Sequence, residues 1–324
     1  MPRSLLRFSN RSALLKGFVP ALLLLAGCAA SGIPMNVESP YLPPSSLQKG
    51  QILHLATGRL VDRTELLEHL SHFPIVYVGE THDSVDDHAV ELAILKGLLE
   101  RSHGGLALGL EMLQRSYQPE VDGYLQGKIT EDRFVEIWQK NWDDSFPYYR
   151  EILSFARENA LPVRALNVGE DLRQAVRGKA LDKPGQKSDG LPEMDLEDPY
   201  HKAFIQSILD AHVMGSHHGE AFYRVQVLWD EAMAETAAEY LKSPEGQGRR
   251  LLILAGGNHV RYGIGIPRRL FRRVPLPYAI VLPFPVEIPD DKRDRLMDVE
   301  MPDLPMRPAD FYWAVGYESL DEPK

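Results

Sequence analysis

The stretch VYVGETHDSVDDH, from Val76 to His88, begins as an apolar run and then carries two histidines and four acidic residues. With the two residues before it, the apolar part reads PIVYVG, which is typical of a strand buried on both faces in a parallel sheet. Asp83 or Ser84 can cap a following helix, because both side chains accept hydrogen bonds from backbone N–H groups. The apolar residues of that helix fall on one stripe: Val85, Ala89, Leu92, Leu95 and Leu99. The stretch therefore predicts a strand, a polar turn and a helix.

The same alternation continues along the chain. Further strand segments are predicted at Leu106–Leu110, Leu161–Leu166, Arg250–Ala255 and Tyr278–Leu282. Helical patterns lie between them at Pro119–Leu125, Glu131–Gln139, Tyr148–Asn159, Glu170–Arg177, Pro199–Met214 and Glu220–Leu241. This alternation predicts an α/β fold with a mostly parallel central sheet flanked by helices. The long stretch between the third and fourth of these strands predicts a helical insertion before the fourth strand.

Polar residues stand where four of these strands end. The first strand is followed by Glu80 and His82, the second by Glu111, the third by Asn167, and the fourth by Asn258 and His259. In an open parallel sheet the carboxyl ends of the strands share one edge, where ligands bind. We therefore expect these side chains to meet at one site.

Glu80, His82, Glu111 and His259 form the centre of this expected site. Two imidazoles and two carboxylates suit a divalent ion such as Zn, Mn or Fe. The alternative is a hydrogen-bonded polar network that closes the end of the sheet, since buried carboxylates need partners whatever their function. Both interpretations assign supporting positions to further residues: Asp83, His88, Asn167, Asp230 and Asn258.

The segment NWDDSFPYYR gathers aromatic side chains, among them Tyr148 and Tyr149. Such a cluster fits a hydrophobic core or an interface. Tyrosine is also an axial ligand of ferric haem, and aromatic walls suit a flat macrocycle, so both tyrosines are candidate haem ligands.

Three loop histidines, His212, His217 and His218, can hold a metal or a propionate, although exposed histidines are the commoner case.

The first 27 residues have the features of a secretory signal peptide. An apolar run from Phe18 to Ala26, too short to span a bilayer, follows four cations, Arg3, Arg7, Arg11 and Lys16. Cys28 is the only cysteine, and the preceding Leu-Ala-Gly resembles a bacterial lipobox, in which the thiol is lipidated. Ala29 after it favours the outer membrane, by resemblance to such lipoproteins. The alternative is an ordinary signal peptide with a chance cysteine.

The rest of the chain divides into three expected parts. Residues 28–48 predict the lipidated cysteine and a Pro-containing tether, residues 49–283 the α/β domain, and residues 284–324 an acidic, Pro-rich C-terminal strap. Loss of residues 1–27 removes four cations and no acids, so the formal charge of −10 becomes −14. A chain this acidic is a poor binder of nucleic acid, which requires clustered Lys and Arg.

Several motifs, in this order, resemble the ChaN-type haem-binding lipoproteins of the Tiki and erythromycin-esterase-like superfamily: VYVGETHD, LGLEM, QPEVDGYLQG, YYREILSFARENALPVRALN, QVLWDEAMA and LAGGNHVRYGIGIPRRL. The resemblance implies an α/β domain that pairs two protomers around haem, and a periplasm-facing outer-membrane lipoprotein of haem or iron uptake. It also relates Gly79 with His82, Gly256 with His259, and Glu111 to a paired Gly-x-x-His motif and an acidic residue of metal-dependent proteases and esterases.

Two functions therefore stay open. The first is a lipid-anchored haem-binding protein whose partners are haem, the outer membrane, a second copy of the chain and an outer-membrane haem receptor. The second is a metal-dependent hydrolase in which Glu80, His82, Glu111 and His259 hold a divalent ion that activates water. The two are compatible, since haem can bind at an interface while the strand ends hold a metal.

Replacement of Cys28 tests the expected anchor. The Cys28→Ser variant should stay unlipidated, and therefore soluble or unprocessed, because the hydroxyl cannot form the thioether. Incorporation of labelled lipid, followed in cells that express each form, measures this. Persisting incorporation in the variant would refute the lipobox interpretation.

Overall fold

A mixed sheet of eight strands forms the centre of the chain, in the order β2-β1-β8-β7-β3-β6-β4-β5. The computed structural model describes residues 42–102, 105–178, 190–211, 219–290 and 302–320. The expected signal peptide, Cys28 and most of the tether lie outside these residues. No helix among the described residues is long and apolar enough to cross a membrane.

Six strands run parallel, as the sequence predicted for the sheet as a whole. They are β3 (Ile75–Glu80), β4 (Leu106–Gln114), β5 (Val163–Asn167), β6 (Arg250–Gly256), β7 (Tyr278–Glu287) and β8 (Phe311–Gly316). β1 (Ile52–His54) pairs antiparallel with both β2 (Arg59–Val61) and β8, so the sheet is mostly parallel with an antiparallel edge.

Three of these strands are additions to the five that the sequence predicted. β1 and β2 have three residues each, too few for a period-two pattern to stand out. β8 comes from the apolar stretch in the expected C-terminal strap, and its register places Leu282 opposite Tyr312. The strap region therefore contributes a strand to the sheet.

Glu111 does not end its strand, contrary to the sequence prediction. β4 continues through the buried Met112 and Leu113 to Gln114. Its pairing with β6 nevertheless stops at Leu110, opposite Leu254. Glu111 is the first residue beyond that ladder, which leaves its side chain at the carboxyl end of β6.

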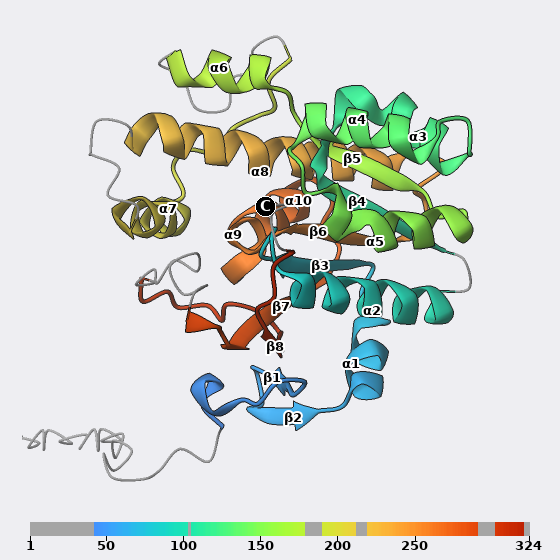
Figure 1. Cartoon of the computed structure of the whole chain (residues 1–324). Helices are drawn as coiled ribbons and strands as arrows, with labels where there is room; N and C mark the ends of the chain where they lie inside the picture. The colour runs from blue at the N-terminus through green and yellow to red at the C-terminus, as the bar shows by residue number, and fades with distance from the viewer. Residues whose placement is uncertain (1–41, 103–104, 179–189, 212–218, 291–301, 321–324) are drawn as a thin grey trace, which may run out of the picture. The chain divides into compact units, whose positions relative to one another are not determined.

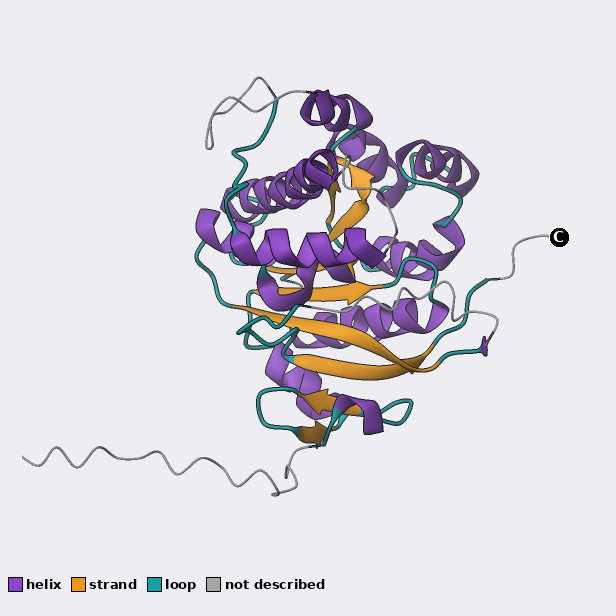
Figure 2. Ribbon diagram, turned by 90° about the vertical axis from the view of Figure 1, so that its left-hand side faces the viewer, coloured by secondary structure: helices purple, strands orange, loops and turns teal. Residues whose placement is uncertain are grey.

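Helices lie on both sides of the sheet (Figures 1 and 2). Those of the first half are α1 (Arg63–Leu70), α2 (Val85–Arg101), α3 (Gln118–Leu125), α4 (Glu131–Asn141), α5 (Phe146–Glu158) and α6 (Glu170–Gly178). Those of the second half are α7 (Pro199–Ala211), α8 (Gly219–Lys242), α9 (Gly257–Val260) and α10 (Ile266–Arg273). α6, α7 and α8 separate β5 from β6 in the chain.

Alternate residues of β3 enter different hydrophobic clusters, as expected for a strand buried on both faces. Val76 and Val78 belong to a cluster with residues of α1 to α5. Ile75 and Tyr77 belong to a second cluster, with residues of α8 and α10. The apolar residues of β3 therefore belong to both hydrophobic clusters, and its polar residue, Glu80, stands at the end of the strand.

Gly79 allows the end of β3 to lie directly against α9. A Cβ atom at this position would come 2.4 Å from Cγ2 of Val260 and 2.5 Å from Cδ2 of Leu282. A side chain here would push α9 away from the sheet, and with it His259. Gly79 thus helps to set the distance between the two polar segments of the site.

Candidate functional site

Glu80, His82 and Tyr149 form the first part of the site, at the end of β3. Nδ1 of His82 donates to Oε1 of Glu80 at 2.6 Å, and the Tyr149 hydroxyl donates to the same oxygen at 3.1 Å. Glu80 and Tyr149 are buried, while the side chain of His82 is 38% exposed. His82 is therefore the member of this group that solvent can reach.

The turn after β3 is held by Asp87, in the first turn of α2. One of its carboxylate oxygens accepts from the backbone N–H of Thr81 at 2.8 Å, and the other accepts from the hydroxyl of Ser84 at 2.7 Å. Ser84 itself caps α2, and its hydroxyl oxygen accepts from the backbone N–H of Asp87. These bonds fix the backbone from which His82 projects.

Glu111, His259 and Asp230 form the second part of the site. Nδ1 of His259 donates to Oδ1 of Asp230 at 2.7 Å, and Nε2 of His259 lies 3.3 Å from Oε1 of Glu111. All three side chains are buried. His259 thus stands between two carboxylates, one from α8 and one from β4.

The two parts meet at Gly256, the last residue of β6. Its backbone N–H donates to Oε2 of Glu111 at 2.7 Å. A Cβ atom at Gly256 would lie 3.1 Å from Nε2 of His82 and 3.6 Å from Oε2 of Glu111. The structure therefore brings Glu80, His82, Glu111 and His259 together at the carboxyl ends of β3, β4 and β6.

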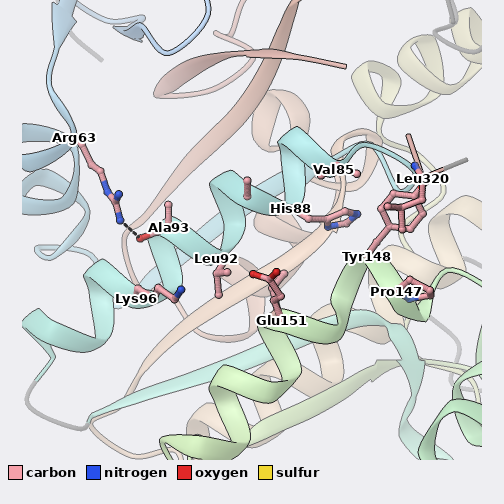
Figure 3. Close-up of a pocket in the computed structure, with 12 residues that line it drawn as sticks. Arg63, Val85, His88, Leu92, Ala93, Lys96, Pro147, Tyr148, Glu151 and Leu320 are labelled. Atoms are coloured by element: carbon pink, nitrogen blue, oxygen red, sulfur yellow. Dashed lines mark hydrogen bonds between the residues drawn. The ribbon is translucent and has the colours of Figure 1, made fainter. Parts of the chain in front are cut away.

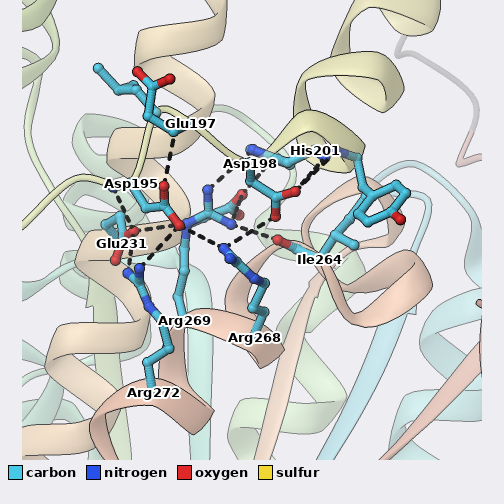
Figure 4. A network of polar contacts seen from close by, with 12 residues as sticks. Asp195, Glu197, Asp198, His201, Glu231, Ile264, Arg268, Arg269 and Arg272 are labelled. Carbon is cyan, nitrogen blue, oxygen red and sulfur yellow. Dashed lines mark hydrogen bonds and ion pairs between the residues drawn. The ribbon is translucent and has the colours of Figure 1, made fainter. Parts of the chain in front are cut away.

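His201 and Arg269, which Figure 4 shows in a wider network of polar contacts, lie next to the other carboxylate oxygen of Asp230. Nε2 of His201, from α7, lies 3.1 Å from Oδ2 of Asp230, and the guanidinium of Arg269, from α10, lies 3.8 Å from the same oxygen. Arg269 also lies 3.1 Å from Nδ1 of His201, to which its guanidinium can only donate. α7, α8, α9 and α10 thus converge on one carboxylate.

Glu231, next to Asp230 on α8, pairs with three of the four arginines of α10. Its carboxylate lies 3.2 Å from Nε of Arg269, 2.8 Å from Arg272 and 2.6 Å from Arg273. Glu231 and Arg269 are completely buried. A buried charge is tolerated only with partners of this kind, so this group is structural and lies behind the site.

Charge pairing raises the pKa of both histidines of the site. Burial alone would lower the pKa of His82, but the Glu80 carboxylate beside it raises that pKa to about 9. Burial opposes charge on His259 as well, yet Glu111 and Asp230 raise its pKa well above the ordinary value. Despite its burial, Glu111 has its pKa lowered to about 2 by His259.

A protonated imidazole has no lone pair for a metal, so an ion at this site would first have to displace these protons. No group of three or more His, Cys, Asp or Glu in the described part of the chain has the geometry of a metal site. As the side chains stand, the arrangement is an ionic network of imidazolium and carboxylate groups. Its solvent-facing His82 can donate a proton.

Two tyrosines that are consecutive in sequence have different surroundings. Tyr149 is fully buried, and its hydroxyl belongs to the Glu80 and His82 group. Tyr148 is half-buried, and its oxygen accepts a hydrogen bond from the backbone N–H of Leu320 at 2.8 Å. Only Tyr148 of this pair lines a surface pocket.

This pocket, between α2 and α5, has a volume of about 390 Å³, within the usual size of small-molecule sites (Figure 3). Apolar side chains make up most of its wall: Val85, Ala89, Leu92, Ala93, Pro147, Ile152 and Leu320. Its polar lining consists of Arg63, Lys96, Glu151, His88 and Tyr148.

His88 lies between the pocket and the ionic network. Its ring centroid is 5.5 Å from that of Tyr148 and 4.4 Å from that of Tyr149. Nδ1 donates to Oε2 of the buried Glu91 at 2.7 Å, and Nε2 donates to the backbone oxygen of His82 at 3.2 Å. Burial opposes charge on His88, but the Glu91 carboxylate beside it raises the pKa of His88 to about 9.

The structure also gives the positions of the other residues that the sequence assigned to the site. The side-chain oxygen of Asn167 accepts from the next backbone N–H, of Val168, which is a local turn contact. Asn258 is half-buried in α9, and Asp83 is half-buried in the turn before α2. The histidines His212, His217 and His218 lie outside the described residues.

Sequence reasoning missed His201 and Arg269, which carry the outer side of the site. Arg269 stands among four arginines in IPRRLFRR, a pattern that normally indicates a solvated helix face. One signal was present, because Arg269 lies between Ile266 and Leu270 on the buried side of α10. Nothing in the sequence around His201 distinguishes it from a surface histidine.

Removal of the Asp230 carboxylate should destabilise the fold strongly. In Asp230→Ala the cations His259 and Arg269 stay buried without this partner, and such a loss costs about 3–5 kcal/mol of unfolding free energy. Urea unfolding measures it. The control is Asp210→Ala, on the exposed surface of α7, where a change below about 0.5 kcal/mol is expected. Similar small losses in both variants would show that Asp230 is not central.

Stability should also depend on pH through His82 and His88. Both have pKa values of about 9 in the folded protein, against 6.5 ordinarily. Between these pH values the folded chain keeps protons that the unfolded chain has lost, so the unfolding free energy should fall as pH rises from 6.5 to 9. Urea unfolding across this range checks the sign, and Glu80→Gln should flatten the slope. A constant or rising free energy would contradict the assigned protonation.

Comparison with known proteins agrees with this architecture. Residues 66–270 match the family described as haem-binding uptake, Tiki superfamily, ChaN. No curated protein matches the chain. Among solved structures, that of cofacial heme binding to ChaN of Campylobacter jejuni is similar, with 17% identity, a TM-score of 0.61 and coverage of 82% of this chain and 98% of that one.

Two other solved structures match with lower scores. The type III effector HopBA1 has 14% identity and a TM-score of 0.44, with coverage of 78% of this chain and 92% of that one. An erythromycin esterase mutant in its open conformation has 14% identity and a TM-score of 0.43, with coverage of 72% and 76%. On the match over residues 66–270, the chain belongs to the ChaN family of haem-binding uptake proteins in the Tiki superfamily.

Proposed function

We propose that this protein is a lipid-anchored haem-binding protein that serves haem or iron uptake. Family membership supports haem as the ligand. The observation in this chain that carries the proposal is the pocket between α2 and α5, which combines apolar walls with a tyrosine and two cations. The proposed anchor is Cys28, which would hold the protein at the outer membrane.

The residues of this pocket fit a haem. A flat apolar macrocycle suits walls such as Leu92 and Ile152, and carboxylate side chains suit Arg63 and Lys96. Bound haem would supply an iron that takes an axial ligand from the protein, and tyrosinate is one such ligand. Tyr148 is the tyrosine of the pocket, and its hydroxyl oxygen accepts a hydrogen bond from the backbone N–H of Leu320. An oxygen that ligates iron can still accept this hydrogen bond.

We also propose that the haem-loaded form is a homodimer. The Campylobacter jejuni structure is described as binding heme cofacially, and two such pockets facing each other would shield two macrocycles from water. An outer-membrane haem receptor is the proposed partner of this form. α6, α7 and α8 are proposed as the helical layer inserted before β6.

The alternative, a metal-dependent hydrolase at the strand ends, has weaker support. Its four proposed ligands include two histidines that are already paired with the carboxylates of Glu80, Glu111 and Asp230. A divalent ion there remains a proposal. Haem binding at the pocket does not require it.

A haem titration of the protein, followed by absorbance, tests the proposed function. The wild type should bind haem saturably with the spectrum of a high-spin, phenolate-ligated ferric haem. Tyr148→Phe should lose that spectrum and bind at least about tenfold more weakly, because the axial bond is gone.

Tyr200→Phe is the matched control, since Tyr200 is 44% exposed on α7 and does not line the pocket. It should behave as the wild type. Wild-type binding that Tyr148→Phe leaves unchanged would move the haem elsewhere on the protein. Absence of any saturable binding would overturn the proposed function.

A further inference from the structure

One end of the pocket between α2 and α5 carries two cations without an acidic partner. Arg63 donates one N–H to the backbone oxygen of Ala93 at 3.2 Å, and Nζ of Lys96 lies 5.5 Å from the ring centroid of Phe155. Neither has a carboxylate within ion-pair distance among the described residues. Both side chains are exposed at the pocket, in a chain whose formal charge is −10.

These cations lie at the opposite end of the pocket from Tyr148. In Figure 3, Arg63 and Lys96 stand on the left, and Tyr148 and Leu320 on the right. His88, Leu92 and Lys96 succeed one another on the same face of α2, so Lys96 is two helical turns, about 12 Å, from His88. A ligand that contacts both ends must span this length.

Small anions should bind weakly to the wall between the two ends of the pocket. It is formed mainly by Ala89, Leu92 and Ile152, which offer a free carboxylate or phosphate no hydrogen bonds. The one acid of the lining, Glu151, is exposed and would repel a carboxylate bound in its vicinity. Among the exposed side chains of the lining, Arg63 and Lys96 are therefore the ones that favour negative charge on a ligand.

We propose that Arg63 and Lys96 bind the carboxylate side chains of a tetrapyrrole and thereby fix its orientation in the pocket. The pocket then selects tetrapyrroles with free carboxylates, whether or not they carry iron. This inference rests on the proposed haem function. Arg63 and Lys96, at one end of the pocket, would recognise the carboxylates of the ligand, and Tyr148, at the other end, would ligate the iron. Arg63 keeps further N–H groups for a carboxylate, since its guanidinium has five donors and one is used.

Iron-free protoporphyrin IX and its dimethyl ester separate these two contributions. Their binding can be followed by quenching of tryptophan fluorescence. The wild type should bind the free acid about tenfold more tightly than the ester, because the ester forms no charge-assisted hydrogen bonds. Arg63→Gln and Lys96→Gln should each weaken binding of the acid by about the same factor. The double variant should no longer distinguish acid from ester.

Control variants separate the effect of the pocket cations from those of other charges, of iron ligation and of misfolding. Lys128→Gln alters an exposed lysine outside the pocket and should bind both compounds as the wild type does. Tyr148→Phe should retain binding of the iron-free acid, because no axial bond is involved. Unchanged unfolding midpoints for Arg63→Gln and Lys96→Gln would show that the fold is intact.

The outcomes distinguish this inference from the proposed function. Wild-type protein that binds haem through Tyr148 but binds acid and ester equally would overturn the carboxylate role and leave the haem function standing. The same holds if Arg63→Gln and Lys96→Gln bind the acid as tightly as the wild type. Failure of the wild type to bind either haem or protoporphyrin would overturn both.

Discussion

The buried carboxylate of Asp230 holds the second half of the structure together. It accepts from His259 at 2.7 Å, and His201 and Arg269 lie 3.1 Å and 3.8 Å from its other oxygen. These partners come from three different helices around α8, and all are buried. In such surroundings an unpaired charge is costly, so each helix is held in the position that completes the pairing. The direction in which His259 presents its ring to Glu111 follows from this constraint.

The ionic network and the surface pocket are two environments built on neighbouring positions of the same elements. Tyr148 and Tyr149 follow each other on α5, and a helix turns each successive side chain by about 100°. One therefore faces the pocket between α2 and α5, and the other enters the ends of the strands. His88 lies between them, buried and in ring contact with both. The apolar pocket and the ionic network are thus adjacent in space, but they are lined by different side chains.

This separation bears on function. The strand-end groups neutralise one another, because each imidazole already has a carboxylate partner at hydrogen-bond distance. The pocket, in contrast, is lined by Tyr148 and by Arg63 and Lys96, which have no acidic partner among the residues that the structure describes. Unpaired cations beside apolar walls favour an amphiphilic anion. Membership of a haem-binding family and the chemistry of this pocket thus support the same class of ligand.

The sequence by itself determined the strand and helix alternation and, through the rule that parallel strands end at one edge, the convergence of Glu80, His82, Glu111 and His259. These are local patterns, readable from hydrophobic periodicity. The sequence could not show that Tyr148 lines the pocket while Tyr149 is buried. Nor could it identify His201 and Arg269 as buried partners of Asp230, because both resemble surface residues in their own segments. Only the tertiary structure decided these, because burial and charge pairing arise from contacts between segments far apart in the chain. The protonation of His82 and His259 depends on the same contacts, since desolvation and neighbouring charges together set a pKa.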